Sequence, residues 1–182
     1  AQPGILVLGT NNAVIASGET PPSFDKGADF GPVPVFSVRT NRFQLVNPDE
    51  GPLLITGTAL NGVSNDVMMV IDMPETVLGG TTSFFGIVFA PQTTGLVTAV
   101  LAISNNSPVT VSNAASPYLI HLAGNAVRSP PDLLSLSGTN QNYDGSAKPV
   151  TVNVEPAGLS SNLTVLYNGG TTPPTNAGAY TV

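Results

Sequence analysis

The sequence predicts an all-β protein in which a β-sandwich is followed by a smaller, mostly-β unit. No window of about eleven or more residues keeps apolar side chains at the i, i+3, i+4 and i+7 spacing of a helix. Several short apolar runs instead alternate with polar residues, as half-buried strands do. The 19 Gly and 17 Pro residues place turn signals between nearly all of these runs.

Nine runs in the first part of the chain are predicted strands, because each is rich in β-branched or aromatic residues and is bounded by turn formers. They span residues 5–8, 13–16, 33–39, 42–46, 53–58, 67–71, 83–89, 96–104 and 118–123. Two further runs follow at 150–154 and 163–167, and a third stops after Tyr180 and Val182. We therefore expect the second unit to be incomplete.

The three longest alternating runs predict which side chains fill the core. In each run every second residue is apolar and lies on one face of its strand. The predicted core residues are Phe85, Ile87 and Phe89, then Val97, Ala99, Leu101 and Ile103, and then Tyr118, Ile120 and Leu122. The opposite faces are partly apolar too, which is typical of central strands in a sandwich.

A proline-containing stretch, GNAVRSPPD from Gly124, predicts the boundary between the two units. Its two adjacent prolines lack amide donors and favour an extended connection. We place a first domain at residues 1–126, a linker at 127–132 and a second domain at 133–182. The small size of the second domain predicts marginal stability.

The surface is predicted to be polar but largely uncharged. Only 9% of the residues are charged, with 5 basic and 11 acidic side chains and a formal net charge of -6. The basic residues are scattered, which argues against nucleic-acid binding. No stretch approaches the roughly 18 consecutive apolar residues of a membrane span, so we expect no membrane insertion of this piece. The start Ala1-Gln2-Pro3 suits a mature end left by signal peptidase, and equally an arbitrary boundary.

A series of motifs in fixed order runs through the first domain. It comprises DKGADFGPVPV from Asp25, FQLVN from Phe43, LLITG from Leu53, PETVLGGTTSFFGIVFAPQTTGLVTAVLAISNN from Pro74 and PYLIHLAGNA from Pro117. With these motifs the domain resembles the choice-of-anchor D modules of bacterial surface proteins, relatives of the ASPM, SPD-2 and Hydin immunoglobulin-like family. The resemblance implies an immunoglobulin-like β-sandwich.

A second series of short motifs occupies the second domain. It consists of YDG from Tyr143, KPV from Lys148, PAGL from Pro156, YNG from Tyr167 and NAG from Asn176. With these motifs the domain resembles the MBG repeat of large bacterial adhesin-like proteins. The resemblance implies an exported structural or adhesive protein whose partners are other modules of the same chain.

The chain shows no arrangement of residues that predicts catalysis. His121 is the single histidine, and it lies in an alternating strand with no G-x-S-x-G nucleophile motif in the sequence. The absence of Cys excludes a thiol nucleophile, a disulfide scaffold and a Cys-based zinc site. We therefore expect no catalytic residue and no cofactor.

Asp25 and Asp29, with Glu19 nearby, are the candidates for a metal site. They offer the hard oxygen ligands that calcium requires, but their spacing is not that of an EF-hand loop. Turn capping is the preferred interpretation, and Asp25 and Asp29 are kept as weak calcium candidates.

Sugar stacking needs exposed aromatic faces, and the chain has no Trp and 4 Tyr. We expect Tyr143 and Tyr167 to pack inside the second domain, because both lie beside turn glycines. A sugar-binding site is therefore not visible in the sequence.

The run Ile5, Leu6, Val7 and Leu8 is a possible assembly strand, because it is apolar and close to the first residue. Such a strand can add to the sheet edge of a neighbouring molecule. The preferred interpretation is that it forms the first strand of its own sandwich.

These observations favour a non-enzymatic extracellular module, secreted or at the cell surface, that serves as a spacer, stalk or adhesive element. One alternative is a subunit that assembles with copies of itself into a fibre or surface layer by strand exchange. Another is a carbohydrate-binding accessory module. Host or cell-surface ligands are possible partners in the adhesive case.

Overall fold

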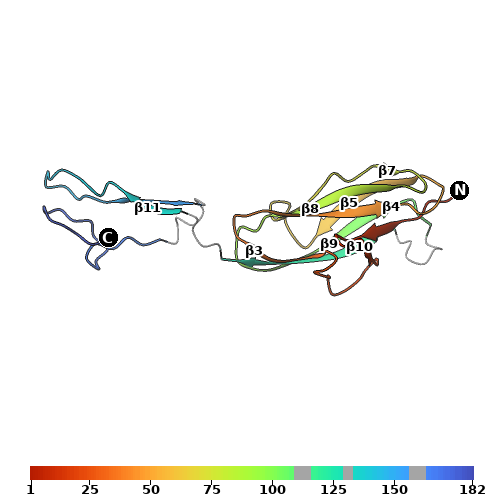
Figure 1. Ribbon diagram of the computed structural model, residues 1–182, viewed down its shortest axis with the longest axis horizontal. Helices are drawn as coiled ribbons and strands as arrows, with labels where there is room; N and C mark the ends of the chain where they lie inside the picture. The colour runs from red at the N-terminus through yellow and green to blue at the C-terminus, as the bar shows by residue number, and fades with distance from the viewer. Residues whose placement is uncertain (109–115, 129–132, 156–162) are drawn as a thin grey trace. The chain divides into compact units, whose positions relative to one another are not determined.

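The computed structural model describes residues 1–108, 116–128, 133–155 and 163–182. The regular secondary structure of these residues consists of β-strands (Figure 1). The chain divides into two compact units, Ala1–Arg128 and Ser129–Val182. The predicted all-β fold is confirmed. In the described part of the chain, no helix has the length and hydropathy that a membrane span requires.

The first unit is an immunoglobulin-like β-sandwich built from two five-stranded sheets. The first sheet contains β1 (Leu6–Leu8), β2 (Val14–Ile15), β4 (Arg39–Val46), β6 (Met68–Ile71) and β8 (Thr82–Phe89), in the order β2-β1-β4-β8-β6. The second sheet contains β3 (Asp29–Pro34), β5 (Leu53–Asn61), β7 (Thr76–Val77), β9 (Gly95–Asn105) and β10 (Tyr118–Val127), in the order β3-β10-β9-β5-β7. Neighbouring strands are antiparallel except β3 and β10, which are parallel.

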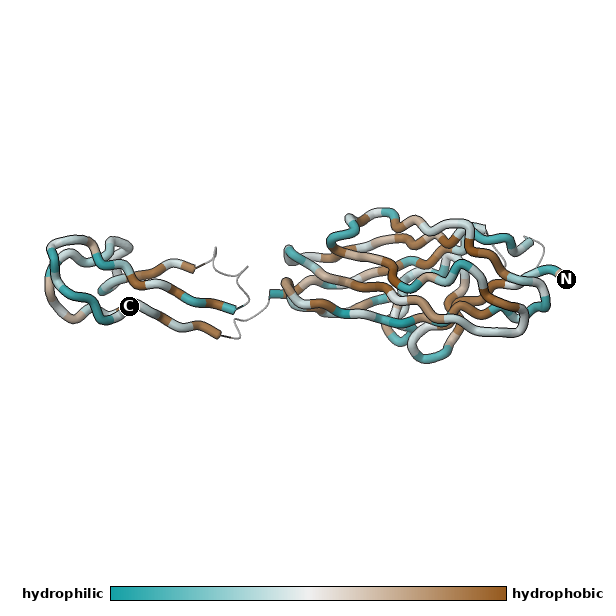
Figure 2. The backbone as a smooth tube through the Cα atoms, turned by 90° about the horizontal axis from the view of Figure 1, so that it is seen from above, coloured by the Kyte–Doolittle hydropathy of each residue, from teal (hydrophilic) through white to brown (hydrophobic). Residues whose placement is uncertain are grey.

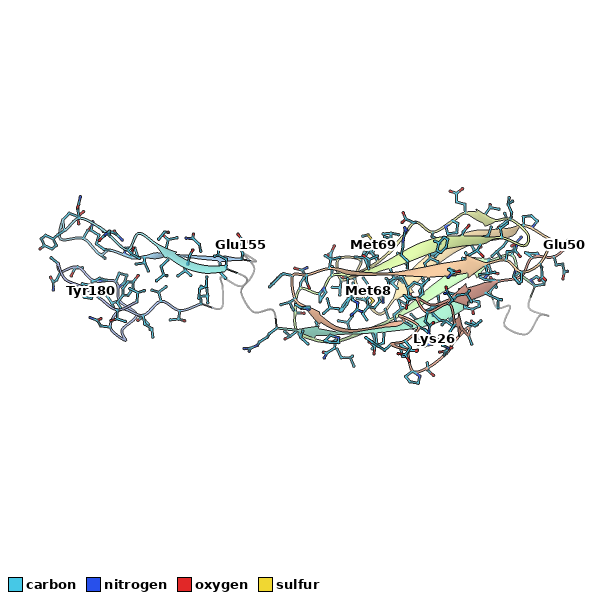
Figure 3. The ribbon with its side chains drawn as sticks, in the orientation of Figure 1. Lys26, Glu50, Met68, Met69, Glu155 and Tyr180 are labelled. Carbon is cyan, nitrogen blue, oxygen red and sulfur yellow. The ribbon has the colours of Figure 1, made fainter. Side chains whose placement is uncertain are left out.

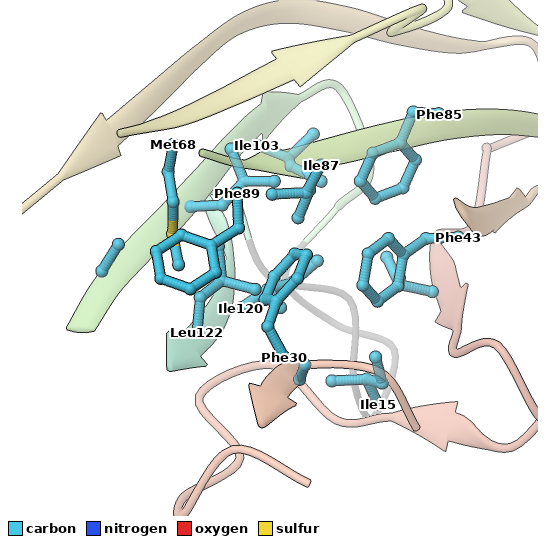
Figure 4. Packing of buried hydrophobic residues seen from close by; sticks show 14 of the residues in the cluster. Ile15, Phe30, Phe43, Met68, Phe85, Ile87, Phe89, Ile103, Ile120 and Leu122 are labelled. Carbon is cyan, nitrogen blue, oxygen red and sulfur yellow. The ribbon is translucent and has the colours of Figure 1, made fainter. Parts of the chain in front are cut away.

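The predicted core faces meet between the two sheets (Figure 4). All ten predicted core residues are buried except Val97, which is half-buried. Phe43 stacks on Phe85 within the first sheet, with ring centroids 5.5 Å apart. Phe30 of β3 and Phe89 of β8 join the two sheets, again with centroids 5.5 Å apart. Hydrophobic and hydrophilic segments alternate along the strands of this unit, so each sheet keeps one apolar face for the core (Figure 2).

The predicted strand at residues 33–39 is wrong, because the chain turns inside it. β3 ends at Pro34, Phe36 adopts a φ of 64°, and β4 begins only at Arg39. The Phe36 amide donates to the Pro91 carbonyl, 2.9 Å away, and fixes the turn. A strand starting at Asp29 was not expected, because Pro32 and Pro34 weaken the strand signal of β3. β7 was not expected either, because it has only two residues.

In the described part of the second unit, β11 (Leu133–Ser137) and β12 (Thr151–Glu155) form an antiparallel pair. The predicted strand at 163–167 is reduced to a single bridge between Tyr167 and Gly170, and residues 180–182 form no strand. β10 continues to Val127, one residue past the predicted end of the first domain, because Val127 pairs with Pro34. Residues 129–132 of the predicted linker and the PAGL motif at 156–159 lie outside the described residues.

Candidate functional site

The predicted assembly strand lies inside its own sheet. β1 pairs with β2 on one side and with β4 on the other, and Leu6 lies opposite Val46. Ile5 and Val7 are buried in the core, while Leu6 and Leu8 are half-buried on the outer face. Strand exchange would have to release β1 from both neighbours, so it stays a prediction.

A buried asparagine holds the segment that leads into β1. The Asn47 side chain is fully buried, and its Oδ1 accepts from the amides of Gly4 at 3.1 Å and Asp49 at 3.3 Å. Its Nδ2 donates to the carbonyls of Gly51 at 2.7 Å and Val77 at 3.0 Å. One side chain thus ties the N-terminal segment to the connection between β4 and β5 and to β7.

The two ends of the first unit lie at opposite ends of β4. β1 begins beside Val46, the last residue of β4. The carbonyl of Val127, at the end of β10, accepts from the Val35 amide at 2.9 Å, just before β4 starts. Figure 1 shows the N-terminus and the end of β10 at opposite ends of this unit, and Glu50 lies at the N-terminal one (Figure 3). Eight residues of strand separate the two ends by about 25 Å.

Of the calcium candidates, Asp25 lies in the loop before β3 and Asp29 is the first residue of β3, while Glu19 lies earlier in the chain and is engaged by other groups. The Lys26 ammonium lies 2.6 Å from Glu19 Oε1, and the Ala16 amide donates to Glu19 Oε2 at 3.0 Å. The hydrogen bond from Lys26 holds the pKa of Glu19 below its usual range. Asp29 Oδ1 caps the Gly31 amide at 2.8 Å, and Asp25 is exposed.

Among the residues that the structure describes, no group of three His, Asp or Glu side chains gathers closely enough to hold a metal ion. The interpretation of Asp25 and Asp29 as calcium ligands stays a prediction.

The two polar aromatic residues of β10 serve the sandwich. His121 is half-buried opposite Val100 of β9. Tyr118 is fully buried, and its hydroxyl donates to the carbonyl of Ile15 in β2. Burial raises the pKa of the Tyr118 hydroxyl. Tyr118 thereby links the second sheet to the edge of the first.

The second unit contains a cleft of about 540 Å³. One wall is the segment 138–143 after β11, and the other is the segment 174–180, with Tyr167 also in the lining. The Lys148 amide donates to the Pro174 carbonyl at 3.0 Å, and the Val150 amide donates to the Tyr167 hydroxyl at 2.9 Å. The side-chain amide of Gln141 in the first wall also donates to the Pro149 carbonyl at 2.9 Å, so both walls are tied to residues 148–150.

Three of the chain's 4 tyrosines line this cleft. Tyr167 is buried as predicted, but the prediction for Tyr143 is wrong, because 67% of that residue is exposed. Tyr180, labelled in Figure 3, is half-buried, and its hydroxyl donates to the Asn176 carbonyl at 3.1 Å. Sequence reasoning missed the cleft because its walls are about thirty residues apart, although the runs TNQN and TTPPTN concentrate amides and hydroxyls.

A family model described as the MBG domain matches residues 133–182, which confirms the resemblance of the second domain. No curated protein matches the chain. The resemblance of the first domain to choice-of-anchor D modules stays a prediction.

Several solved structures are similar to this chain. The VesB protease of Vibrio cholerae is 13% identical with a TM-score of 0.44, over 54% of this chain and 29% of that one. The ASH / PapD-like domain 7 of human CEP192 is 11% identical with a TM-score of 0.42, over 65% of this chain and 96% of that one. WR4, an MSP family member of C. elegans, is 14% identical with a TM-score of 0.36, over 55% of this chain and 93% of that one. The chain spans less than a third of the protease, and these likenesses concern the fold alone.

Proposed function

We propose that the chain is a non-enzymatic structural module of an exported surface protein, in which the first unit is a spacer that resists mechanical extension. The observation that carries this proposal is the position of its two ends, at opposite ends of β4. A pull through both ends runs along β1 and β10, so the hydrogen bonds of each terminal strand are loaded together rather than one after another. Such shear loading makes a β-sandwich resist extension.

The bonds around each terminal strand support this role. At the N-terminal end, Gly51 donates to the Gln2 carbonyl at 3.2 Å and Ser107 donates to the Pro3 carbonyl at 3.2 Å, in addition to the Asn47 bonds. At the other end, β10 pairs with β9 from Tyr118 to Ala126 and with β3 from Ala123 to Val127. The match of residues 133–182 to the MBG domain, which occurs in surface proteins, supports an extracellular location.

Single-molecule force spectroscopy tests the proposal by comparing two directions of pull on the whole chain. The chain contains no Cys, so a pair of introduced cysteines defines the attachment points. One variant carries Gln2→Cys with Arg128→Cys and is pulled along the terminal strands. The other carries Asn61→Cys with Thr98→Cys, and is pulled so that the β5–β9 pair opens from one end. Asn61 ends this pairing opposite Val100, Thr98 lies two residues before Val100 in β9, and both positions are exposed.

We expect the first variant to unfold at clearly higher force than the second at the same pulling speed. Equal forces, or a lower force along the terminal strands, would contradict the spacer role. A complementary experiment treats intact cells of the source organism with a protease that cannot enter them. Digestion of this module on intact cells is expected, and protection until lysis would contradict the surface location.

A further inference from the structure

We propose that the cleft of the second unit binds a neutral oligosaccharide. This site is separate from the spacer role, because every residue that lines it lies in the second unit. Its volume of about 540 Å³ falls within the roughly 300–1,000 Å³ of small-ligand sites.

The first reason is that three tyrosines line the cleft and that one of them, Tyr143, presents its ring to solvent. Tyr143 is 67% exposed, although a ring of this size gains free energy when its faces are covered. Tyr167 and Tyr180 lie in the same lining, and their hydroxyls are tied to Val150 and Asn176. The C–H groups on one face of a sugar ring pack well on such an aromatic face, while its hydroxyls remain free for polar partners.

The second reason is a set of unused amides. The side chains of Asn140, Asn142 and Asn176 line the cleft and have no hydrogen-bond partner among the described residues. An amide offers two donor hydrogens and an acceptor oxygen, which matches neighbouring sugar hydroxyls that both donate and accept. A proline-rich peptide could also lie on tyrosine rings, but its proline rings would leave these amides unmatched.

The third reason is the charge of the lining. Among the described residues that line the cleft, Lys148 has the one charged side chain. Its ammonium lies 2.6 Å from Asp144 Oδ2. This contact holds the pKa of Asp144 well below its usual range, so the pair stays ionised and mutually neutralised. A cleft without net charge favours a neutral ligand over an acidic polysaccharide or a phosphate.

Intrinsic tyrosine fluorescence measures binding, because the chain has no Trp and three of its 4 Tyr line the cleft. The full chain is titrated with hexasaccharides of β-1,4-linked glucose, α-1,4-linked glucose and β-1,4-linked mannose. A heparin-derived hexasaccharide and a proline decapeptide are titrated in parallel. Variants Tyr143→Ala, Tyr143→Phe and Asn176→Ala probe the cleft, and Phe84→Ala, an aromatic residue of the first unit that is 56% exposed, is the matched control.

We expect saturable binding of at least one neutral hexasaccharide, weakened about tenfold or more by Tyr143→Ala. Asn176→Ala should also weaken it, whereas Tyr143→Phe and Phe84→Ala should leave it within about twofold. Amide chemical shifts of each variant check that the second unit keeps its fold. The proposal is overturned if no neutral sugar binds saturably, if only the heparin fragment or the peptide binds, or if Tyr143→Ala and Phe84→Ala bind alike.

Discussion

At the scale of single residues, Asn47 is the polar side chain with the largest predicted effect on stability. Replacing Asn47 by Ala removes all four hydrogen bonds and leaves the Gly4 amide and the carbonyls of Gly51 and Val77 without this partner in a buried place. We expect a loss of about 2–4 kcal/mol in the free energy of unfolding, measured by urea titration.

Asn106→Ala is the matched control. Asn106 bonds to the Leu54 amide and the Pro52 carbonyl, but it is exposed, so water can replace both bonds. The loss there should stay below about 1 kcal/mol. If both variants lost the same free energy of unfolding, the burial of Asn47 would not explain how much this side chain stabilises the fold.

We expect Glu19 to make the stability of the fold depend on pH. Its pKa in the folded chain is lowered, chiefly by the hydrogen bond from Lys26, so the unfolded chain takes up a proton at a higher pH than the folded chain. The pair therefore stabilises the fold above about pH 4.3, and this contribution disappears as the pH falls through the lowered pKa. Because both side chains are partly exposed, we expect less than about 1 kcal/mol.

The measurement compares urea midpoints of the wild type and Glu19→Gln at pH 7 and at pH 3. The wild type should be the more stable at pH 7, and the difference should shrink at pH 3. Asp72→Asn, which breaks the exposed Arg42–Asp72 pair, should have little effect at pH 7. A Glu19→Gln difference that grew toward pH 3 would contradict the sign of this linkage.

At the scale of elements, β10 depends on a glycine that gives room to a core aromatic ring. A Cβ on Gly124 would lie 2.5 Å from Cε1 of Phe89, which is fully buried and packs on Phe30. The pairing of β10 with β3 also shifts register between Ala123 and Asn125. We expect Gly124→Ala to cost about 1–3 kcal/mol, because either the ring or the strand must move.

Gly57 in β5 provides the control for this strand prediction. A Cβ there meets nothing within 4 Å, and the residue is exposed. Gly57→Ala should change the free energy of unfolding by at most about 0.5 kcal/mol. If both substitutions had similar effects in urea titrations, the steric explanation for Gly124 would fail.

The strands differ in how well the sequence predicts them. β8, β9 and β10 are long and carry an apolar residue at every second position of one face, so their core residues were predictable from periodicity. The turn at Phe36 was not predictable from periodicity. The positive φ of this apolar residue depends on its contact with Pro91, which is distant in the sequence, rather than on a local preference. The cleft was not predictable for the same reason, since its two walls are joined through residues 148 and 149, by the contacts of Pro174 with Lys148 and of Gln141 with Pro149.

At the scale of the whole molecule, the two units differ in how much apolar surface they bury. The core cluster lies entirely in the first unit, whereas the buried apolar residues among the described part of the second are Val154 and Tyr167. Leu133, Leu134 and Leu136 of β11 are all exposed. Because burial of apolar surface drives folding, we expect the second unit to unfold at a lower temperature than the first.

Differential scanning calorimetry should therefore show two transitions for the full chain, and tyrosine fluorescence should follow mainly the lower one, since three of the 4 tyrosines lie in the second unit. Phe85→Ala removes a fully buried ring from the first core and should cost about 3–5 kcal/mol there. The upper transition should move down while the lower one stays in place. One transition that shifts as a whole would mean that the two units fold as a single cooperative body, which the separation of their buried residues argues against.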